Sequence, residues 1–253
     1  MTTADRWARA VREQLGLGRL LPLGGARDGA WIAERAVREV LLAAARGVAG
    51  VRPGDLRVGL ADPQATHEPA VPPPPGALPP GPLRVTADFA ATVGPAAVSA
   101  EPLPVTAERL RAALADAAAD RLGLAVPDVD LRVTGLLDAA AGPASGGEPR
   151  PAEPDAGPER GDSDAADEGD AGRIAGAALA VPGVARLTGV LGRPVHVTEP
   201  PPPEGALPRR HVRVELAVDA GHRAVEVTRR VRAAVSETLP DHPSVAVVVT
   251  AVG

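Results

Sequence analysis

The histidines near the C-terminus have the spacing that comes closest to a metal site. His211 opens one predicted strand and His242 precedes another, so parallel strands would bring both to one sheet edge, with His196 or Asp241 nearby. Two imidazoles and a carboxylate form a common ligand set for Zn²⁺. The corresponding positions in the first half of the chain are prolines, and histidines are frequent in surface loops. The sequence therefore favours ordinary loop histidines, and we predict no metal-binding residue.

No arrangement typical of a catalytic or cofactor site is present in the sequence. It has no Gly-x-Ser-x-Gly elbow, no His-Glu-x-x-His, no Gly-Lys-Ser/Thr phosphate loop, and no cysteine, lysine or tyrosine. Gly16-Leu17-Gly18 lacks the third glycine and the preceding strand of a dinucleotide-binding turn. Asp128 and Asp130 lie at a strand end, where carboxylates are more typical of turns than of an acid–base pair. We predict no catalytic residue, no cofactor and no enzymatic activity.

Charge and composition narrow the classes of partner. All 27 basic residues are arginine, and the net charge of −5 argues against a general nucleic-acid-binding protein. The arginines between residues 209 and 232 also lack aromatic neighbours on which bases could stack. No apolar run is long enough to cross a membrane, and arginines interrupt the N-terminal segment where a secretion signal would be apolar. We expect a cytoplasmic protein.

A short pattern occurs twice along the chain, in residues 28–138 and 171–253. Gly-Ala-Leu-Pro stands at residues 76–79 and again at 205–208, and the register then continues without a gap to Leu83–Val85 and Val212–Val214. Three further pairs of blocks match in the same order: residues 48–51 with 181–184, 110–114 with 231–235, and 131–136 with 247–252. This series of matched blocks indicates an internal duplication.

Each half reads as helix, strand, strand, helix and strand. The first half has helical spacing from Ile32 to Ala44, strands at Leu56–Leu60 and Leu83–Phe89, a helix between a candidate N-cap at Thr106 and Gly123, and a strand at Val129–Val133. The second half has a short helix near Arg173–Val181, strands at Pro194–Thr198 and His211–Asp219, a helix through Val227, Val231 and Val235, and a strand at Ser244–Val252. We predict an α+β fold of two repeated small α-β-β-α-β modules, each a mixed three-stranded sheet with helices on one face.

Segments of low complexity separate these elements. Residues 139–170 are rich in Gly, Pro, Asp and Glu, and they carry too little apolar surface to fold, so we predict a disordered acidic linker. Pro69–Pro82 and Pro200–Pro208 are predicted to be stiff, extended connectors between the first two strands of each half. The predicted organisation is an N-terminal amphipathic segment at 1–27, a first repeat at 28–138, the linker at 139–170 and a second repeat at 171–253.

Ala246, Val248 and Thr250 form one of two candidate interaction surfaces. They lie on the outer face of the last strand, where a solvated face should be polar. Either these small side chains tolerate water, or the other half of the chain or a partner covers them.

The second candidate surface is the stripe of Trp7, Val11 and Leu15. These residues fall on one face of a predicted N-terminal helix flanked by arginines. That helix would either pack on the first repeat or dock on a partner, and a protein partner fits its narrow apolar stripe better than a lipid surface does.

The first half resembles the alkaline-shock, or envelope stress response, protein family. The resemblance rests on Trp31-Ile32-Ala33-Glu34 opening a helix that ends at Gly47–Val51, and on Arg121–Val126 leading into the closing strand Val129–Val133. It covers roughly 110 residues, and the second half shares it only through the repeat. The resemblance implies a non-enzymatic, cytoplasmic protein, often associated with the membrane through a separate anchor protein, with no catalytic residues to transfer.

Taken together, these patterns favour a structural or interaction protein, a scaffold with an unidentified protein partner. The resemblance adds the expectation of an indirect, peripheral association with the membrane through such a partner. The alternative is a regulatory module that binds a small ligand in a crevice between the two repeats.

Overall fold

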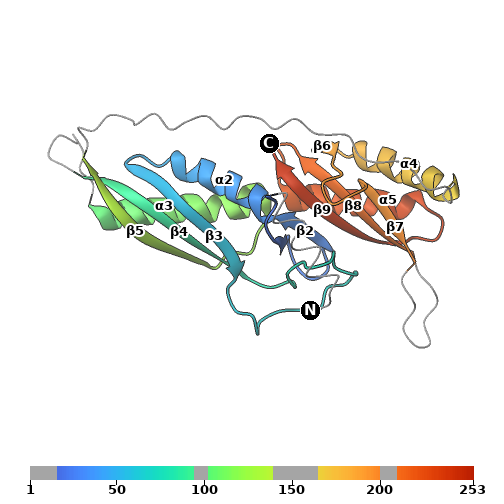
Figure 1. Cartoon of the computed structure of the whole chain (residues 1–253), viewed down its shortest axis with the longest axis horizontal. Coiled ribbons are helices and arrows are strands. Elements are labelled where there is room, and N and C mark those ends of the chain that lie inside the picture. The colour runs from blue at the N-terminus through green and yellow to red at the C-terminus, as the bar shows by residue number, and fades with distance from the viewer. Residues whose placement is uncertain (1–15, 94–101, 139–164, 200–209) are drawn as a thin grey trace.

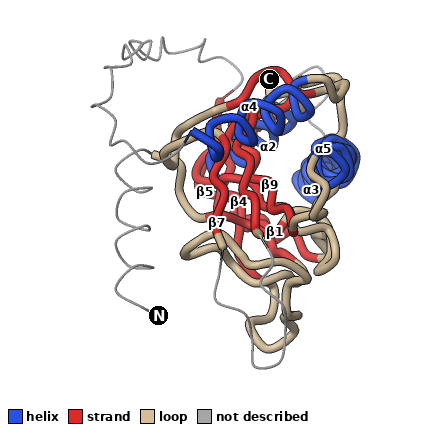
Figure 2. The backbone as a smooth tube through the Cα atoms, turned by 90° about the vertical axis from the view of Figure 1, so that its right-hand side faces the viewer, coloured by secondary structure: helices blue, strands red, loops and turns tan. Residues whose placement is uncertain are grey.

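The computed structural model describes residues 16–93, 102–138, 165–199 and 210–253. These residues form a mixed α and β fold with two sheets side by side along the long axis of the molecule (Figure 1). Viewed along that axis, the helices lie on one side of the strands and the long loops on the other (Figure 2). The described α-helices are α2 (Glu34–Arg46), α3 (Leu103–Asp116), α4 (Ala165–Leu179) and α5 (Ala224–Thr238).

The first sheet has the three strands predicted for the first half. Its order is β3 (Val51–Leu60), β4 (Leu83–Val93) and β5 (Asp128–Asp138), with β3 antiparallel and β5 parallel to β4. The side chains of β4 alternate as the sequence predicts, because the apolar ones are buried beneath α2 and α3: Leu83, Val85, Ala87 and Phe89. Gly123 ends the short π-helix η1 (Ala117–Leu122), which extends α3, with a left-handed φ of 83°.

The second sheet has six strands rather than three, which corrects the prediction of a separate three-stranded module. Its order is β1 (Leu20–Pro22), β2 (Ala30–Ala33), β9 (Ser244–Val252), β8 (His211–Val218) and β6 (Val184–Leu187), and β7 (Val195–Thr198) also pairs with β8. Strand β2 is parallel to β9, so the beginning of the first half completes the sheet of the second half. The predicted N-terminal segment 1–27 contributes β1 to this sheet.

Trp31 and Ile32 lie in a strand, so the prediction that they open a helix is wrong. The helix begins only at Glu34, after Ala33 in an extended conformation. Their spacing fits a helix, but both side chains are buried, one on each face of the sheet, because β2 pairs with β9. Tertiary pairing overrides the local periodicity at this position.

Three further predictions of local structure need correction. Strand β6 was not predicted, since its sequence Val-Ala-Arg-Leu shows little alternation. Thr106 is a buried residue inside α3, and the N-cap is Pro102. Residues 165–170 were predicted as linker but begin α4, where Asp170 is ion-paired with Arg173 and Arg210. The remainder of the predicted linker, 139–164, lies outside the described residues.

The two halves share one continuous hydrophobic core. Polar contacts join the halves beside it: Arg223 donates to the carbonyl of Ala119, and Arg229 forms an ion pair with Asp28 at 2.7 Å. Arg232 donates to the carbonyl oxygens of residues 27 and 28, just before β2. The chain therefore holds its halves together through a shared sheet, a shared core and paired charges.

Candidate functional site

The candidate surface on the last strand is buried within the chain. Ala246 and Val248 are fully buried, and the hydroxyl of Thr250 lies 2.8 Å from that of Thr188. Trp31 pairs in register with Val248 on the neighbouring strand, so its ring lies on the same face of the sheet. These three residues are therefore not exposed to an external partner.

The loop before β4 covers this face. The indole N–H of Trp31 donates to the carbonyl oxygen of Leu78 at 3.1 Å, and the backbone N–H of Leu78 donates to Leu20 in β1. Val71, in the same loop, is buried against the core. The Pro69–Pro82 segment thus packs on the second sheet in addition to connecting two strands. The other proline-rich segment, Pro200–Pro208, lies outside the described residues, as do Trp7, Val11 and Leu15.

The histidines considered as metal ligands have other partners. The Nδ1 atom of His211 lies 2.9 Å from the Oγ of Ser244, and that of His242 lies 3.0 Å from the carbonyl oxygen of Ser236. Asp241 forms a two-pronged pair with Arg210. Burial and the nearby charge of Arg213 lower the pKa of His211. Within the part of the chain that the structure describes, no three potential ligands are close enough together to hold a metal ion.

A groove of about 400 Å³ lies beside the start of α2. Its walls carry the Arg19–Glu34 and Arg35–Glu39 ion pairs, and its apolar floor is Leu42 and Leu56. Burial raises the pKa of Glu34, but the hydrogen bonds and charge of Arg19, together with a backbone hydrogen bond from Val58, lower it by more. All lining residues fall between residues 16 and 57, so this groove is not a crevice between the two halves.

Glu215 is an unusual buried carboxyl group in β8. Its Oε2 accepts the backbone N–H of Leu191, while its Oε1 lies 3.4 Å from Arg213 and has no hydrogen-bond partner among the described residues. Burial raises the pKa of Glu215. The hydrogen bond from Leu191 and the charge of Arg213 act in the opposite direction, but burial outweighs them and favours the protonated carboxyl group.

We expect Glu215→Gln to stabilise the protein at neutral pH. Because the folded-state pKa of Glu215 is raised, its contribution to stability is fully present below the unfolded-state pKa and is lost as the pH rises through the folded-state value. Glutamine keeps an acceptor for Leu191 and does not ionise. Urea denaturation should show the variant to be more stable than the wild type at pH 7, with the difference shrinking in acid. A less stable variant at pH 7 would show that the ionised carboxylate is held by Arg213.

The edges of the sheets differ in how they are protected. The six-stranded sheet ends in strands of three or four residues, β1 on one side and β6 with β7 on the other. On the outer edge of β3, Pro53 lies beside a bulge, and the carbonyl of Val58 accepts a hydrogen bond from Arg19. Short strands, prolines, bulges and charged side chains all hinder pairing at an edge.

The outer edge of β5 has fewer of these protections. Among the described residues, this strand of 11 residues pairs only with β4, and it contains no proline. Its side chains facing the helices are Val129 and Leu131, which are partly buried, and Val133, which is 41% exposed. Further along, Leu136 is 63% exposed. Leu103 and Val105, at the start of α3, are also exposed, so most of the large exposed apolar residues described belong to β5 and α3.

This edge is not visible in the sequence. The alternation of Val129, Leu131 and Val133 correctly predicts a strand with one apolar face. The apolar side chains on this face do not distinguish β5 from β9, whose corresponding face is completely buried. The difference depends on which strand finds a neighbour in the folded chain.

Comparison with protein-family models, curated proteins and solved structures finds no match for this chain. No helix among the described residues is long and apolar enough to cross a membrane. The candidate site therefore rests on the geometry of the chain itself.

Proposed function

We propose that this chain is a non-enzymatic structural or interaction protein, a scaffold that acts through contacts with other proteins. The observation that carries the proposal is the exposed end formed by β5 and α3, where a strand edge without a partner among the described residues lies beside Leu103, Val105, Val133 and Leu136. Exposed strand edges and clustered apolar side chains are typical of protein-binding surfaces. The rest of the described chain supports this end through a core shared by both halves.

The scaffold would be built from two copies of one α-β-β-α-β unit. In each half the first strand is antiparallel and the last strand parallel to the middle one. Matching contacts support this duplication. The Nε of Arg111 donates to the carbonyl of Val129, as Arg232 does to Val245.

Two further contacts recur in both halves and also support the duplication. A threonine sits at a bulge of each last strand and donates to the middle strand, Thr134 to Phe89 and Thr250 to Leu216, both at 3.3 Å. When the two threonines are equated, Val85 in β4 corresponds to Val212 in β8. The gapless alignment predicted from the sequence instead equates Leu83 with Val212, so the two alignments differ by two residues.

The resemblance to the envelope stress response family agrees with a scaffold role but extends less far than its motifs suggested. The Gly47–Val51 turn follows α2, and Arg121–Val126 leads into β5, as the resemblance implies. Trp31-Ile32-Ala33 is a strand here and does not open the helix. A cytoplasmic location and an indirect association with the membrane are part of this proposal.

The alternative is a regulatory module that binds a small ligand. The groove beside α2 favours it, because the cationic side chains of Arg57 and of Arg38, which lies 4.0 Å from Asp55, line a hollow with an apolar floor. In addition, the Nε of Arg38 is buried without a hydrogen-bond partner among the described residues. Such a groove fits a small anionic ligand, and it lies within the first half and not between the halves.

Purification of the tagged full-length chain from its native host tests the scaffold role. We expect a reproducible set of proteins to accompany the wild type and to fall by about tenfold with Leu136→Asp. The matched control is Leu179→Asp in α4, which is also an exposed leucine but lies in the other half. Absence of accompanying proteins, or equal losses in both variants, would contradict the proposal.

A further inference from the structure

The corresponding edges of the two halves differ in one respect. The edge of β9 is covered by β2, which pairs with it in parallel, and by α2, which packs beside it. The edge of β5 has no such cover among the described residues. As a result, Val249 is fully buried while Val133, its counterpart before the threonine bulge, is 41% exposed.

The backbone of β5 is oriented for pairing at this edge. In the second half, the backbone N–H of Val247 in β9 donates to the carbonyl of Gly29, on the side of β2. The carbonyl of Val245 lies on the same side of β9 and accepts a hydrogen bond from Arg232. In the first half, Arg111 donates in the same way to the carbonyl of Val129, so this carbonyl lies on the side of the open edge of β5. Since alternate residues of a strand direct their backbone groups to the same side, Leu131 and Val133 direct theirs to the open edge.

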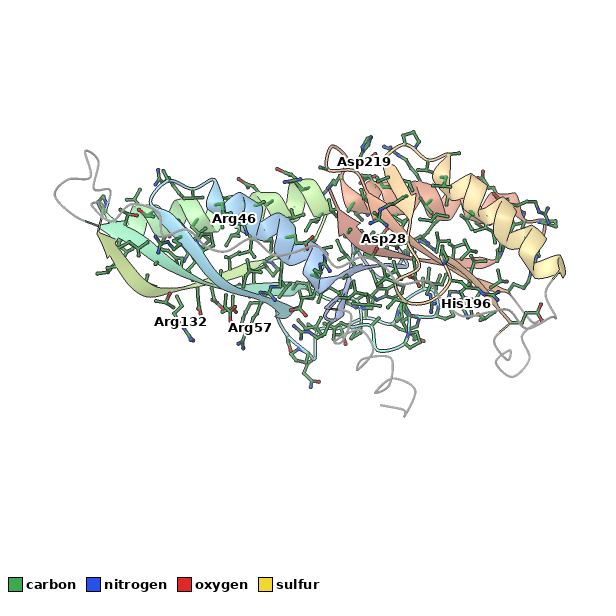
Figure 3. The ribbon with its side chains drawn as sticks, turned by 45° about the horizontal axis from the view of Figure 1, so that its top comes forward. Asp28, Arg46, Arg57, Arg132, His196 and Asp219 are labelled. Atoms are coloured by element: carbon green, nitrogen blue, oxygen red, sulfur yellow. The ribbon has the colours of Figure 1, made fainter. Side chains whose placement is uncertain are left out.

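The side chains of one β5 strand complement those of a second β5 strand that runs antiparallel to it. Along the strand the order is Val129, Asp130, Leu131, Arg132 and Val133, which places an acid and a base symmetrically about Leu131. Asp130 and Arg132 are exposed on the face away from the helices, where Arg132 and Arg57 extend outward (Figure 3). Two such strands in antiparallel pairing about Leu131 would put each Asp130 opposite an Arg132.

We propose that a second copy of this chain occupies the β5 edge, joined about a two-fold axis at Leu131. This inference rests on the proposed scaffold function and names one of its partners. Leu131 pairs with its own counterpart, and each Val129 pairs with the other chain's Val133 on the helix-facing side. On the outer face, two Asp130–Arg132 pairs select this register. A shift of two residues would instead place Asp130 opposite Asp130 or Arg132 opposite Arg132.

The pairing suits the interactions already present in β5. The carbonyl of Val129 accepts from Arg111 and retains a second lone pair for the neighbouring strand. Asp130 lies 3.5 Å from Arg84 in β4, so each carboxylate would lie between two guanidinium groups. The two three-stranded sheets would become one six-stranded sheet, equal in strand number to the second sheet of the chain.

Charge reversal across the strand tests both the partner and the register. Sedimentation equilibrium of the full-length chain over a concentration series should show a reversible dimer. Asp130→Arg and Arg132→Asp should each weaken dimerisation by about tenfold, because each places two pairs of like charges in contact. The double variant Asp130→Arg/Arg132→Asp restores opposite charges only in the proposed register, and should recover the dimer. Arg57→Asp, a reversal on β3, should leave it unchanged.

Circular dichroism of each variant establishes that the chain remains folded. A monomer at every concentration, unchanged dimerisation in the single variants, or a double variant as weak as the single ones would overturn the proposal. The scaffold function is judged separately from the proteins that accompany the chain in its host. If the chain is a monomer but its accompanying proteins are still lost with Leu136→Asp, self-association is refuted and the scaffold function is not. A dimer without accompanying proteins would refute the binding of other partners alone.

Discussion

Replacement of Trp31 by alanine should lower the free energy of unfolding by about 3–5 kcal/mol, the usual cost of removing a large buried aromatic side chain. Trp31 is almost fully buried in β2 and pairs in register with Val248 of β9. Its indole N–H also holds the loop before β4 through the carbonyl of Leu78. The ring therefore joins the first half, the second half and the loop. Denaturation in urea, followed by circular dichroism, measures the loss.

Trp31→Phe is the matched control. Phenylalanine keeps most of the apolar volume but cannot donate to Leu78, so we expect a loss of only about 1 kcal/mol plus a small packing cost. Near-native stability of Trp31→Ala would show that β2 does not pack in the shared sheet. A single transition in the wild type, monitored by both tryptophan fluorescence and circular dichroism, would agree with one cooperative core.

Replacement of Val248 by aspartate should be at least as damaging, with an expected loss of about 4 kcal/mol or more. Val248 is fully buried at the centre of β9, between the paired strands β2 and β8. A carboxylate at this position would lose its hydration beside the buried carboxyl group of Glu215, its partner in register. Chemical denaturation at pH 7 should show the loss, and acid should reduce it as the new carboxyl group becomes protonated.

Arg132→Asp provides a closely matched control for Val248→Asp. Arg132 occupies the corresponding place in β5, two residues before the threonine at the bulge, but it is exposed. At concentrations where the chain is monomeric, its replacement should change stability by no more than about 0.5 kcal/mol. Equal effects of the two aspartates would contradict the burial of the outer face of β9.

Local pattern alone was sufficient to predict many elements. The alternation of β4, the apolar stripe of α5 at Val227, Val231 and Val235, and the bounds of β9 all follow from period and side-chain type. Gly123 ends the helical segment as predicted, because its left-handed φ favours a residue without a Cβ atom. These features depend on neighbours close in sequence, which a single chain displays directly.

Pairing between distant segments was decided only by the tertiary structure. The apolar outer face of β9 indicated that something covers Val248 or that water reaches it, but the sequence could not identify Trp31 and its loop as the cover. Trp31 and Ile32 fit a helix by spacing, yet they form a strand because a parallel partner buries both faces.

The candidate site shows the same division between local pattern and tertiary pairing. The sequence by itself determined the absence of familiar catalytic motifs, the alternation of the closing strand Val129–Val133 and the apolar character of both faces of the closing strand Ser244–Val252. It could not show that β9 acquires a neighbour at its edge while β5, within the part of the chain that the structure describes, does not. The types of the side chains along a strand show which of its faces is apolar. The edge of a strand, in contrast, consists of backbone N–H and C=O groups, which are nearly the same in every sequence. The exposed edge of β5 therefore became visible only when the chain was folded.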